Sequence, residues 1–210
     1  FLSFNPAEPL LSRFVDEDFN RLWSPEVLDG PRTSAELERA RELRPFVDGV
    51  DFLLDIHSMQ TSVAPLMLAG PLPKGRELAG ALGMPVYVVS DEGHAAGRRL
   101  RDYGDFGVPS SKKNALLVEC GQHWEKASAD VSLQTALRFL LACDAVEPES
   151  VEAHLTLVEG AQKFVEVTDV VTIKTNAFTF VEPYRGLEVI PEAGTLLGRD
   201  GGEDVRTPHD

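Results

Sequence analysis

A histidine and a glutamate each follow an apolar run that is typical of a buried strand. His57 comes directly after the run at 50–56, and Glu119 lies at the end of the run NALLVE. Ligands of parallel sheets bind at the carboxyl ends of the strands, so both side chains are candidates for a functional site. A histidine at such an end can bind a metal or act as a general base. The alternative is a histidine that caps the strand end and hydrogen-bonds a neighbouring loop.

The carboxylate of Glu119 would be costly to bury without a partner. A metal, an arginine or a catalytic task would explain its place, because burial raises the pKa of a carboxyl group toward the range that suits a general base. The alternative is a carboxylate that reaches the rim of the sheet and meets water. For the adjacent Cys120, the sequence favours a small buried strand residue over a nucleophile.

Two arginines and an asparagine fall within one loop, SRFVDEDFNRLW. The guanidinium groups of Arg13 and Arg21, with the amide of Asn20, can hold a carboxylate because arginine presents a planar fork of donors. Asp16 and Asp18 are candidates to hold the arginines in position. The alternative is a solvated loop whose ion pairs are weak, as surface pairs usually are.

The other candidate groups have less defined roles. The stretch GHAAGRRLRDYG, with Arg98, Arg99 and Arg101, is either a lid that contributes a basic residue or, as we favour, a solvated helix face. His123 is expected to be structural or to support the site. The roles of His94 and of the loop at 91–113 stay open. The chain has no GxSxG elbow, glycine-rich phosphate loop or CxxC pair.

Strands and helices alternate along the part of the chain that would position these residues. Apolar runs predict strands at 50–56, 65–69, 85–90 and 114–120, and helical spacing predicts helices from Thr33 to Val47, at 75–83 and at 127–143. Thr33 and Glu36 have the spacing of a capping box. The alternation indicates an α/β fold, a three-layer α/β/α sandwich with a mixed, mostly parallel sheet.

The pattern changes after residue 160, where KFVEVTDVVTIKT and NAFTFVEPY alternate apolar and polar residues. This alternation predicts a small antiparallel β unit. We therefore expect a catalytic domain at 1–160 and a partial C-terminal β domain at 161–210. The apolar opening FLSFNP favours a chain that starts inside a longer protein.

The acidic composition excludes several classes of partner. A formal net charge of −14 argues against nucleic acid or anionic lipid, although a local basic pocket can still bind a small anion. No apolar run is long enough for a membrane-spanning helix. With only two cysteines, a disulfide framework is not expected, and a cytoplasmic location is the default.

Taken in order, RFVDEDFNR, LLDIHS and LLVECGQH resemble the succinylglutamate desuccinylase/aspartoacylase family of zinc-dependent deacylases, which is related in fold to zinc carboxypeptidases. The resemblance implies that His57 is a zinc ligand, that Arg13 polarises the scissile carbonyl, and that Asn20 and Arg21 bind a substrate carboxylate. It also implies that Glu119 is the general base for a zinc-activated water. The implied substrate is a small N-acyl amino acid or a similar anionic amide, and a homo-oligomer is one option for the assembly.

The sequence departs from the family pattern in two places. The family's first two zinc ligands lie in an HGxE-type motif before the FNP segment, and the chain does not contain that motif, so two ligands are expected upstream of Phe1. The family's arginine in the loop before Glu119 is also missing, and Lys112 and Lys113 stand there instead. Two alternatives therefore stay open: a non-catalytic or metal-poor relative, and a module that binds anionic metabolites through its arginines.

Overall fold

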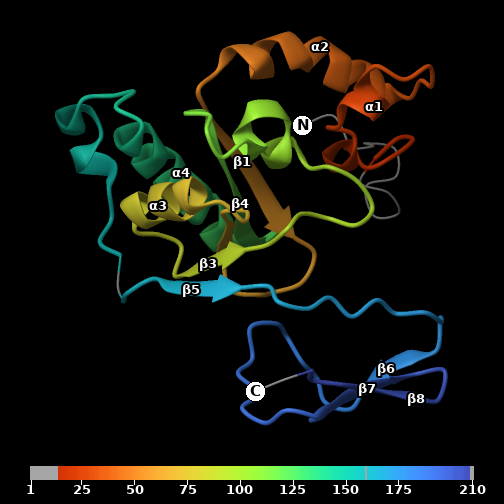
Figure 1. Cartoon of the computed structure of the whole chain (residues 1–210). Coiled ribbons are helices and arrows are strands. Elements are labelled where there is room, and N and C mark those ends of the chain that lie inside the picture. Colours follow the sequence, from red (N-terminus) through yellow and green to blue (C-terminus); the bar gives the residue numbers. More distant parts are fainter. Residues whose placement is uncertain (1–13, 159, 209–210) are drawn as a thin grey trace.

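The structure is a computed structural model that describes residues 14–158 and 160–208 (Figure 1). Within these residues, five strands form one sheet in the order β1-β4-β2-β3-β5. They are β1 (Phe52–Met59), β2 (Leu66–Leu68), β3 (Tyr87–Ser90), β4 (Asn114–Gln122) and β5 (Lys163–Glu166). β1 runs parallel to β4, and β2, β3 and β5 run parallel to one another but antiparallel to β4. The mixed, mostly parallel sheet is therefore confirmed.

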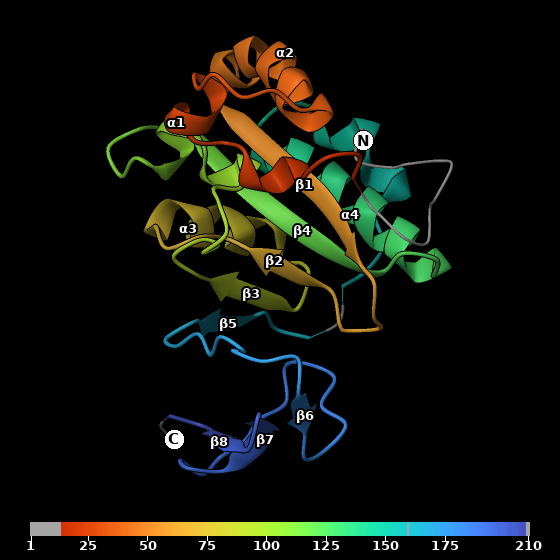
Figure 2. The same ribbon diagram turned by 90° about the vertical axis from the view of Figure 1, so that its right-hand side faces the viewer.

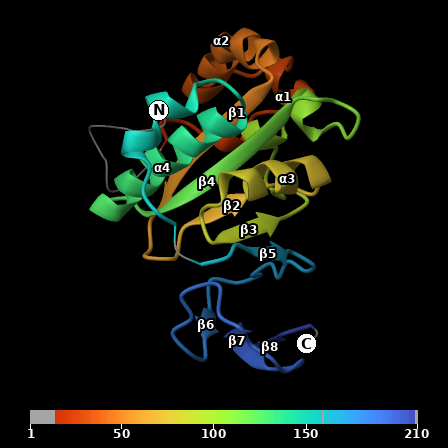
Figure 3. The same cartoon turned by 90° about the vertical axis from the view of Figure 1, so that its left-hand side faces the viewer.

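Helices and turns cover both faces of this sheet, which confirms the three-layer sandwich. One face carries α3 (Pro73–Leu82) and α4 (Lys126–Ala142), in front of the strands in Figure 3. Their apolar side chains, Leu82 and Phe139 among them, share a core with Leu116 of β4. Over the other face lie α1 (Pro25–Leu28), α2 (Ala35–Gly49) and the 3₁₀ turns η1 (Phe19–Arg21), η2 (Leu100–Asp102) and η3 (Gly104–Gly107) (Figure 2). Two further 3₁₀ turns, η4 (Pro148–Ser150) and η5 (Glu152–His154), follow α4.

The strand that carries His57 is an edge strand, and our prediction that it is buried is wrong. β1 pairs with β4 along one side, and Phe52 and Ile56 on β1 are 40% and 46% exposed. An apolar run has the same sequence signature at the edge of a sheet as at its centre, because burial depends on neighbours from elsewhere in the chain. β4, by contrast, is buried over most of its length, as its unbroken apolar run predicted.

The start of α2 also differs from the prediction. Its N-cap is Ser34 rather than Thr33, and Ser34 Oγ accepts a hydrogen bond from the backbone N–H of Leu37 at 3.0 Å. Thr33 and Ser34 both suit an N-cap by residue type. Ser34, whose backbone is extended, is the N-cap in the structure. Glu36 does not complete a capping box, since its carboxylate binds a distant loop.

The C-terminal part forms a second, antiparallel sheet of β6 (Phe178–Phe180), β7 (Leu196–Asp200) and β8 (Glu203–Arg206) (Figure 1). This confirms the small β unit, with one correction: its expected first strand, KFVE, is β5, which joins the large sheet in parallel with β3. Alternation predicts a strand but does not select its partner. Within the described residues, no helix has the length and apolar content needed to cross a bilayer.

We predict that Leu82→Ala lowers the free energy of unfolding by about 2–5 kcal/mol, because it leaves a cavity in the core between α3 and the sheet. Urea unfolding followed by circular dichroism measures the change. Leu157→Ala, at a leucine that is almost fully exposed, is the matched control and should leave the value nearly unchanged. Equal effects of the two substitutions would contradict this core.

Candidate functional site

His57 and Glu119 lie side by side on adjacent strands. They are register partners in the β1–β4 pair, so their side chains leave the same face of the sheet. Each lies a few residues before the end of its strand, because β1 continues to Met59 and β4 to Gln122. Both side chains are partly buried. The structure therefore brings together the two residues that the sequence singled out separately.

Asp55 is a site residue that the sequence analysis missed. Its Oδ1 lies 2.9 Å from Nε2 of His57, two positions along the same strand and on the same face. A carboxylate that accepts the Nε2–H hydrogen bond leaves the lone pair of the neutral ring on Nδ1 and fixes the orientation of the ring. The Asp-x-His spacing within a predicted strand was the signal that could have identified it.

Asn20 lies between this pair and a loop from the middle of the chain. Its Nδ2 is 3.4 Å from Oδ2 of Asp55 and 3.4 Å from Nε2 of His57, and its Oδ1 accepts a hydrogen bond from the backbone N–H of Leu100 at 2.7 Å. Its own backbone N–H is bound by Asp18 Oδ1, which caps η1. The buried amide thus links three segments of the chain, and its role as a substrate ligand stays a prediction.

A buried carboxylate holds the loop that leads into η1. Glu36, 1% exposed, accepts hydrogen bonds from the backbone N–H groups of Val15, Asp16 and Glu17 at 2.6, 3.1 and 3.3 Å. In return, Asp16 Oδ2 accepts from the N–H of Ala35 at the start of α2. Asp16, expected to position an arginine, is therefore used in fixing the loop to the helix.

Arg21 contacts residues of its own loop through its side chain and Gly97 through its backbone. Its Nη1 donates to the carbonyl of Asn20 at 2.6 Å, and its Nη2 is 3.7 Å from Asp18 Oδ2, as predicted for that aspartate. Gly97 packs so closely that a Cβ there would lie 2.3 Å from the Arg21 carbonyl oxygen, and its φ of +148° also favours glycine. Burial and the charges of Arg21 and Arg99 lower the pKa of the nearby His94.

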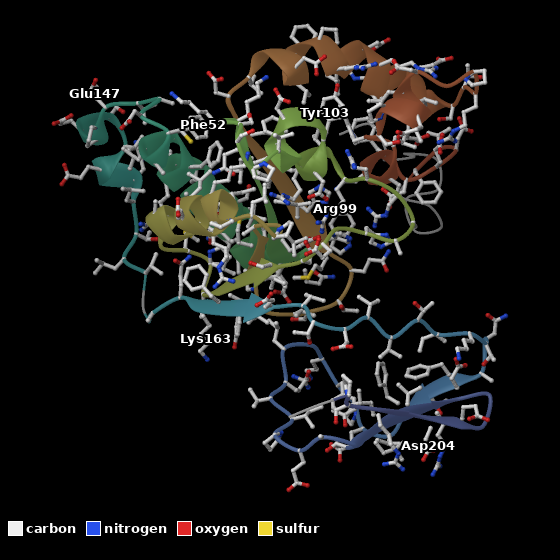
Figure 4. The ribbon with its side chains drawn as sticks, in the orientation of Figure 1. Phe52, Arg99, Tyr103, Glu147, Lys163 and Asp204 are labelled. Carbon is white, nitrogen blue, oxygen red and sulfur yellow. The ribbon has the colours of Figure 1, made fainter. Side chains whose placement is uncertain are left out.

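The basic stretch is not the solvated helix face that we favoured. Arg99 and Arg101 are only 4% and 5% exposed, and Figure 4 shows Arg99 among the elements that surround the five-stranded sheet. Arg99 binds Asp91 through two hydrogen bonds of 2.8 Å and Asp102 through one of 2.6 Å. Arg101 binds Asp102 and the carbonyls of Ala69 and Ala115. Burial lowers the pKa of Arg101, and the charge of Asp102 opposes this effect.

Arg98 is exposed at a cavity of about 550 Å³ formed mainly by the loops at 92–98 and 101–108. The described lining includes His94 and Arg98 but neither His57 nor Glu119.

His123, expected to be structural or supporting, has its Nδ1 2.7 Å from Ser58 Oγ at the end of β1. Burial and the neighbouring Glu119 raise the pKa of Cys120 to about 11, which agrees with an unreactive strand residue.

The described residues do not complete a metal site. Arg13 lies outside them, and within them no group of three His, Cys, Asp or Glu side chains is arranged to hold an ion. The candidate ligand His57 has Asp55 at its Nε2. A catalytic zinc normally has three protein ligands, so the residues present here do not fit a complete zinc centre.

We predict that Asp55→Asn changes the position of the proton on His57. The neutral amide no longer favours the Nε2–H tautomer as a carboxylate does, so the population with the proton on Nδ1 should increase. Long-range ¹⁵N–¹H NMR spectra of the imidazole report the tautomer directly. Asp51→Asn, at an exposed residue just before β1, is the control. An unchanged tautomer in Asp55→Asn would rule out this role.

Comparison with known proteins identifies structures of the same fold. No protein-family model and no curated protein matches the chain. A succinylglutamate desuccinylase from Vibrio parahaemolyticus matches with a TM-score of 0.63 and 15% identity over 95% of this chain. One from Vibrio cholerae matches with a TM-score of 0.62 and 17% identity over 95% of this chain. Murine aminoacylase 3 matches with a TM-score of 0.60 and 18% identity over 98% of this chain.

The chain is shorter than these proteins. It spans 60% and 59% of the two desuccinylases and 73% of the murine aminoacylase. The likeness includes the C-terminal β unit, since it covers nearly the whole of this chain. The chain therefore has the fold of the succinylglutamate desuccinylase and aminoacylase structures.

Proposed function

We propose that this chain is part of a hydrolase of the succinylglutamate desuccinylase/aspartoacylase family that cleaves the amide bond of a small N-acyl amino acid or a related carboxylate-bearing substrate. The observation that carries the proposal is the pairing of His57 with Glu119 on adjacent strands, with Asp55 and Asn20 beside the imidazole. The shared fold also supports the proposal. An imidazole and a carboxylate on one face of a sheet are suited to proton transfer to and from a reacting amide.

In this proposal Glu119 is the general base. It takes a proton from the attacking water and delivers it to the leaving amine. It lies partly buried on β4 as the register partner of His57, so a water held near the imidazole would be within reach of its carboxylate. Asp55 holds the ring of His57 through Nε2, and the amide of Asn20 lies beside it and contacts the other carboxylate oxygen of Asp55. Arg13 would stabilise charge that develops on the scissile carbonyl oxygen.

Asn20 and Arg21 are the proposed ligands of the substrate carboxylate. The guanidinium of Arg21 is fixed from behind by the carbonyl of Asn20 and by Asp18, so little freedom is lost when it binds an anion. For Asn20, this role would require its amide to exchange a protein contact for a substrate contact. The arginine is therefore the stronger of the two proposed ligands.

A zinc ion, one per full-length protein, is also proposed as the cofactor. His57 is the only one of its proposed ligands within the described residues, and the others are expected upstream of Phe1. A cytoplasmic location, and an assembly that includes the option of a homo-oligomer, are further proposals. The thiols of Cys120 and Cys143, which form no disulfide, suit a reducing compartment.

The incomplete metal site favours one alternative, a relative that binds anionic metabolites without hydrolysing them. Such a protein would use Arg21 for binding and would have no need of Glu119 as a base. The two functions differ in what the loss of Glu119 does to turnover and in whether the chain holds a metal.

We predict that Glu119→Gln lowers turnover of the best substrate in a panel of N-acyl amino acids by about 10²- to 10⁴-fold, the usual contribution of a general base. The protein used is the full-length form, and released amino acid is measured by chromatography. Glu77→Gln, on the exposed side of α3, is the control. Turnover that survives Glu119→Gln would exclude it as the base, and a full-length wild type inactive on the whole panel would favour the metabolite-binding alternative.

We predict that the 210-residue chain binds far less than one zinc ion after incubation with zinc and gel filtration, because one histidine ligand holds the metal weakly. His57→Ala should lower the content further, while His154→Ala, on the η5 turn, should not. Metal analysis by mass spectrometry measures the content. One tightly bound zinc per chain would contradict the proposed set of ligands.

A further inference from the structure

The side chain of Lys74, near the start of α3, ends among backbone carbonyl groups of the loop that leads into β4. Its Nζ lies 2.6 Å from the carbonyl oxygen of Lys113, 2.8 Å from that of Val108, 3.1 Å from that of Ser111 and 3.4 Å from that of Asp105. An ammonium group has three N–H donors, so the four oxygens outnumber them. We call these four groups the carbonyl cage, because they surround the ammonium as ligands surround a bound cation.

Short turns of the loop orient the carbonyl cage. The backbone N–H of Val108 donates to the carbonyl of Asp105 at 3.2 Å, and that of Ser111 donates to the carbonyl of Val108 at 3.1 Å. The N–H of Lys113 binds Ser111 Oγ at 3.1 Å. A carbonyl oxygen has two lone pairs, so it can accept a turn hydrogen bond and still face a cation. The cage therefore arises from the local folding of the loop as well as from Lys74.

The backbone of Lys74 has an anchor of its own. Asn114, a buried residue at the start of β4, donates from Nδ2 to the carbonyl of Lys74 at 2.7 Å. Lys74 is the second residue of α3, whose Leu78 and Leu82 are packed in the core under the sheet. A change confined to the end of the Lys74 side chain therefore leaves α3 joined to β4.

A cation at this place needs oxygen atoms to replace its water. Burial and the charge of Arg101 lower the pKa of Lys74, and the charge of Asp105 opposes them. A charged group that is shielded from water is costly unless polar atoms compensate it. Backbone carbonyls compensate K⁺ in this way in the selectivity filters of potassium channels. The carbonyl cage offers the same chemistry to the ammonium of Lys74.

The loop that contains the carbonyl cage also forms a wall of the cavity of about 550 Å³. Phe106, Gly107 and Val108 belong to the lining of that cavity. The loop continues directly into β4, the strand that carries Glu119. The group that fills the cage therefore fixes both a cavity wall and the start of this strand.

We propose that the loop at 105–113 forms a binding site for a monovalent cation and that Lys74 fills this site with its own ammonium group. The class of ligand is a compact cation such as K⁺ or NH₄⁺, which are close in size to each other and to a lysine ammonium. Mg²⁺ suits the site less, because it demands octahedral geometry and holds its water tightly. The inference is independent of the proposed function, since it concerns the order of the loop and not the reaction.

The test removes the ammonium group and supplies a cation from solution. Lys74→Met keeps most of the side-chain volume without the charge. Circular dichroism gives its melting temperature in equal concentrations of choline chloride, NaCl, KCl and NH₄Cl, so that general screening is the same in all four. In choline chloride the variant should melt at least about 5 °C below the wild type, and KCl or NH₄Cl should restore at least half of this loss. NaCl should restore less.

Lys112→Met is the matched control, because Lys112 is an exposed lysine of the same loop whose carbonyl is not part of the cage. Its melting temperature should be the same in KCl and in choline chloride. The inference is overturned if the control is stabilised by K⁺ as much as Lys74→Met. It is also overturned if Lys74→Met melts at one temperature in all four salts or folds in none of them.

A second measurement uses the wild type and does not depend on the folding of a variant. Proton–nitrogen NMR spectra of the lysine ammonium groups report how fast each exchanges its protons with water. The Lys74 ammonium should exchange much more slowly than that of Lys112, because carbonyl oxygens surround it. Equal exchange rates of the two groups would contradict an occupied cage.

Discussion

The arrangement of the candidate site depends on two buried guanidinium groups that share one carboxylate. Asp102 binds both Arg99 and Arg101, and Arg101 also binds the carbonyls of Ala69, just after β2, and of Ala115, near the start of β4. Loss of one partner from such a buried network typically costs about 3–5 kcal/mol, because a charge is then left without compensation. The network therefore fixes the loop at 91–102 onto the face of the sheet.

That loop in turn places the segment that carries the candidate ligands. The carbonyl of Arg98 accepts the backbone N–H of Trp23, and the backbone N–H of Leu100 binds the side chain of Asn20. Asn20 then meets Asp55 and His57 on β1. The arginine network is therefore connected to the imidazole through two contacts, one from Leu100 to Asn20 and one from Asn20 to Asp55 and His57. The charged residues that looked solvated in the sequence are thus the support of the site.

Part of the acidic excess of the chain is engaged in contacts within the protein. Three carboxylates accept hydrogen bonds from other parts of the chain: Glu36 from three backbone N–H groups, Glu188 from the 185–186 turn, and Asp102 from two arginines. Each engaged carboxylate stabilises a segment that presents a cation or an amide. The acidic excess of the composition is therefore in part structural, and in the proposed function Arg21 is the cation that would bind a small carboxylate.

The sequence by itself determined the α/β class, the positions of the main strands and helices, and the two strands that carry His57 and Glu119. These follow from local periodicity, which the backbone geometry of a helix or strand imposes on any chain. Only the tertiary structure decided that β1 is an edge strand, that KFVE joins the large sheet, and that Arg99 and Arg101 are buried. The same holds for the contacts of Asn20 with Asp55 and His57. Burial and pairing are properties of residues distant in sequence, so a local pattern that is compatible with several partners cannot select among them.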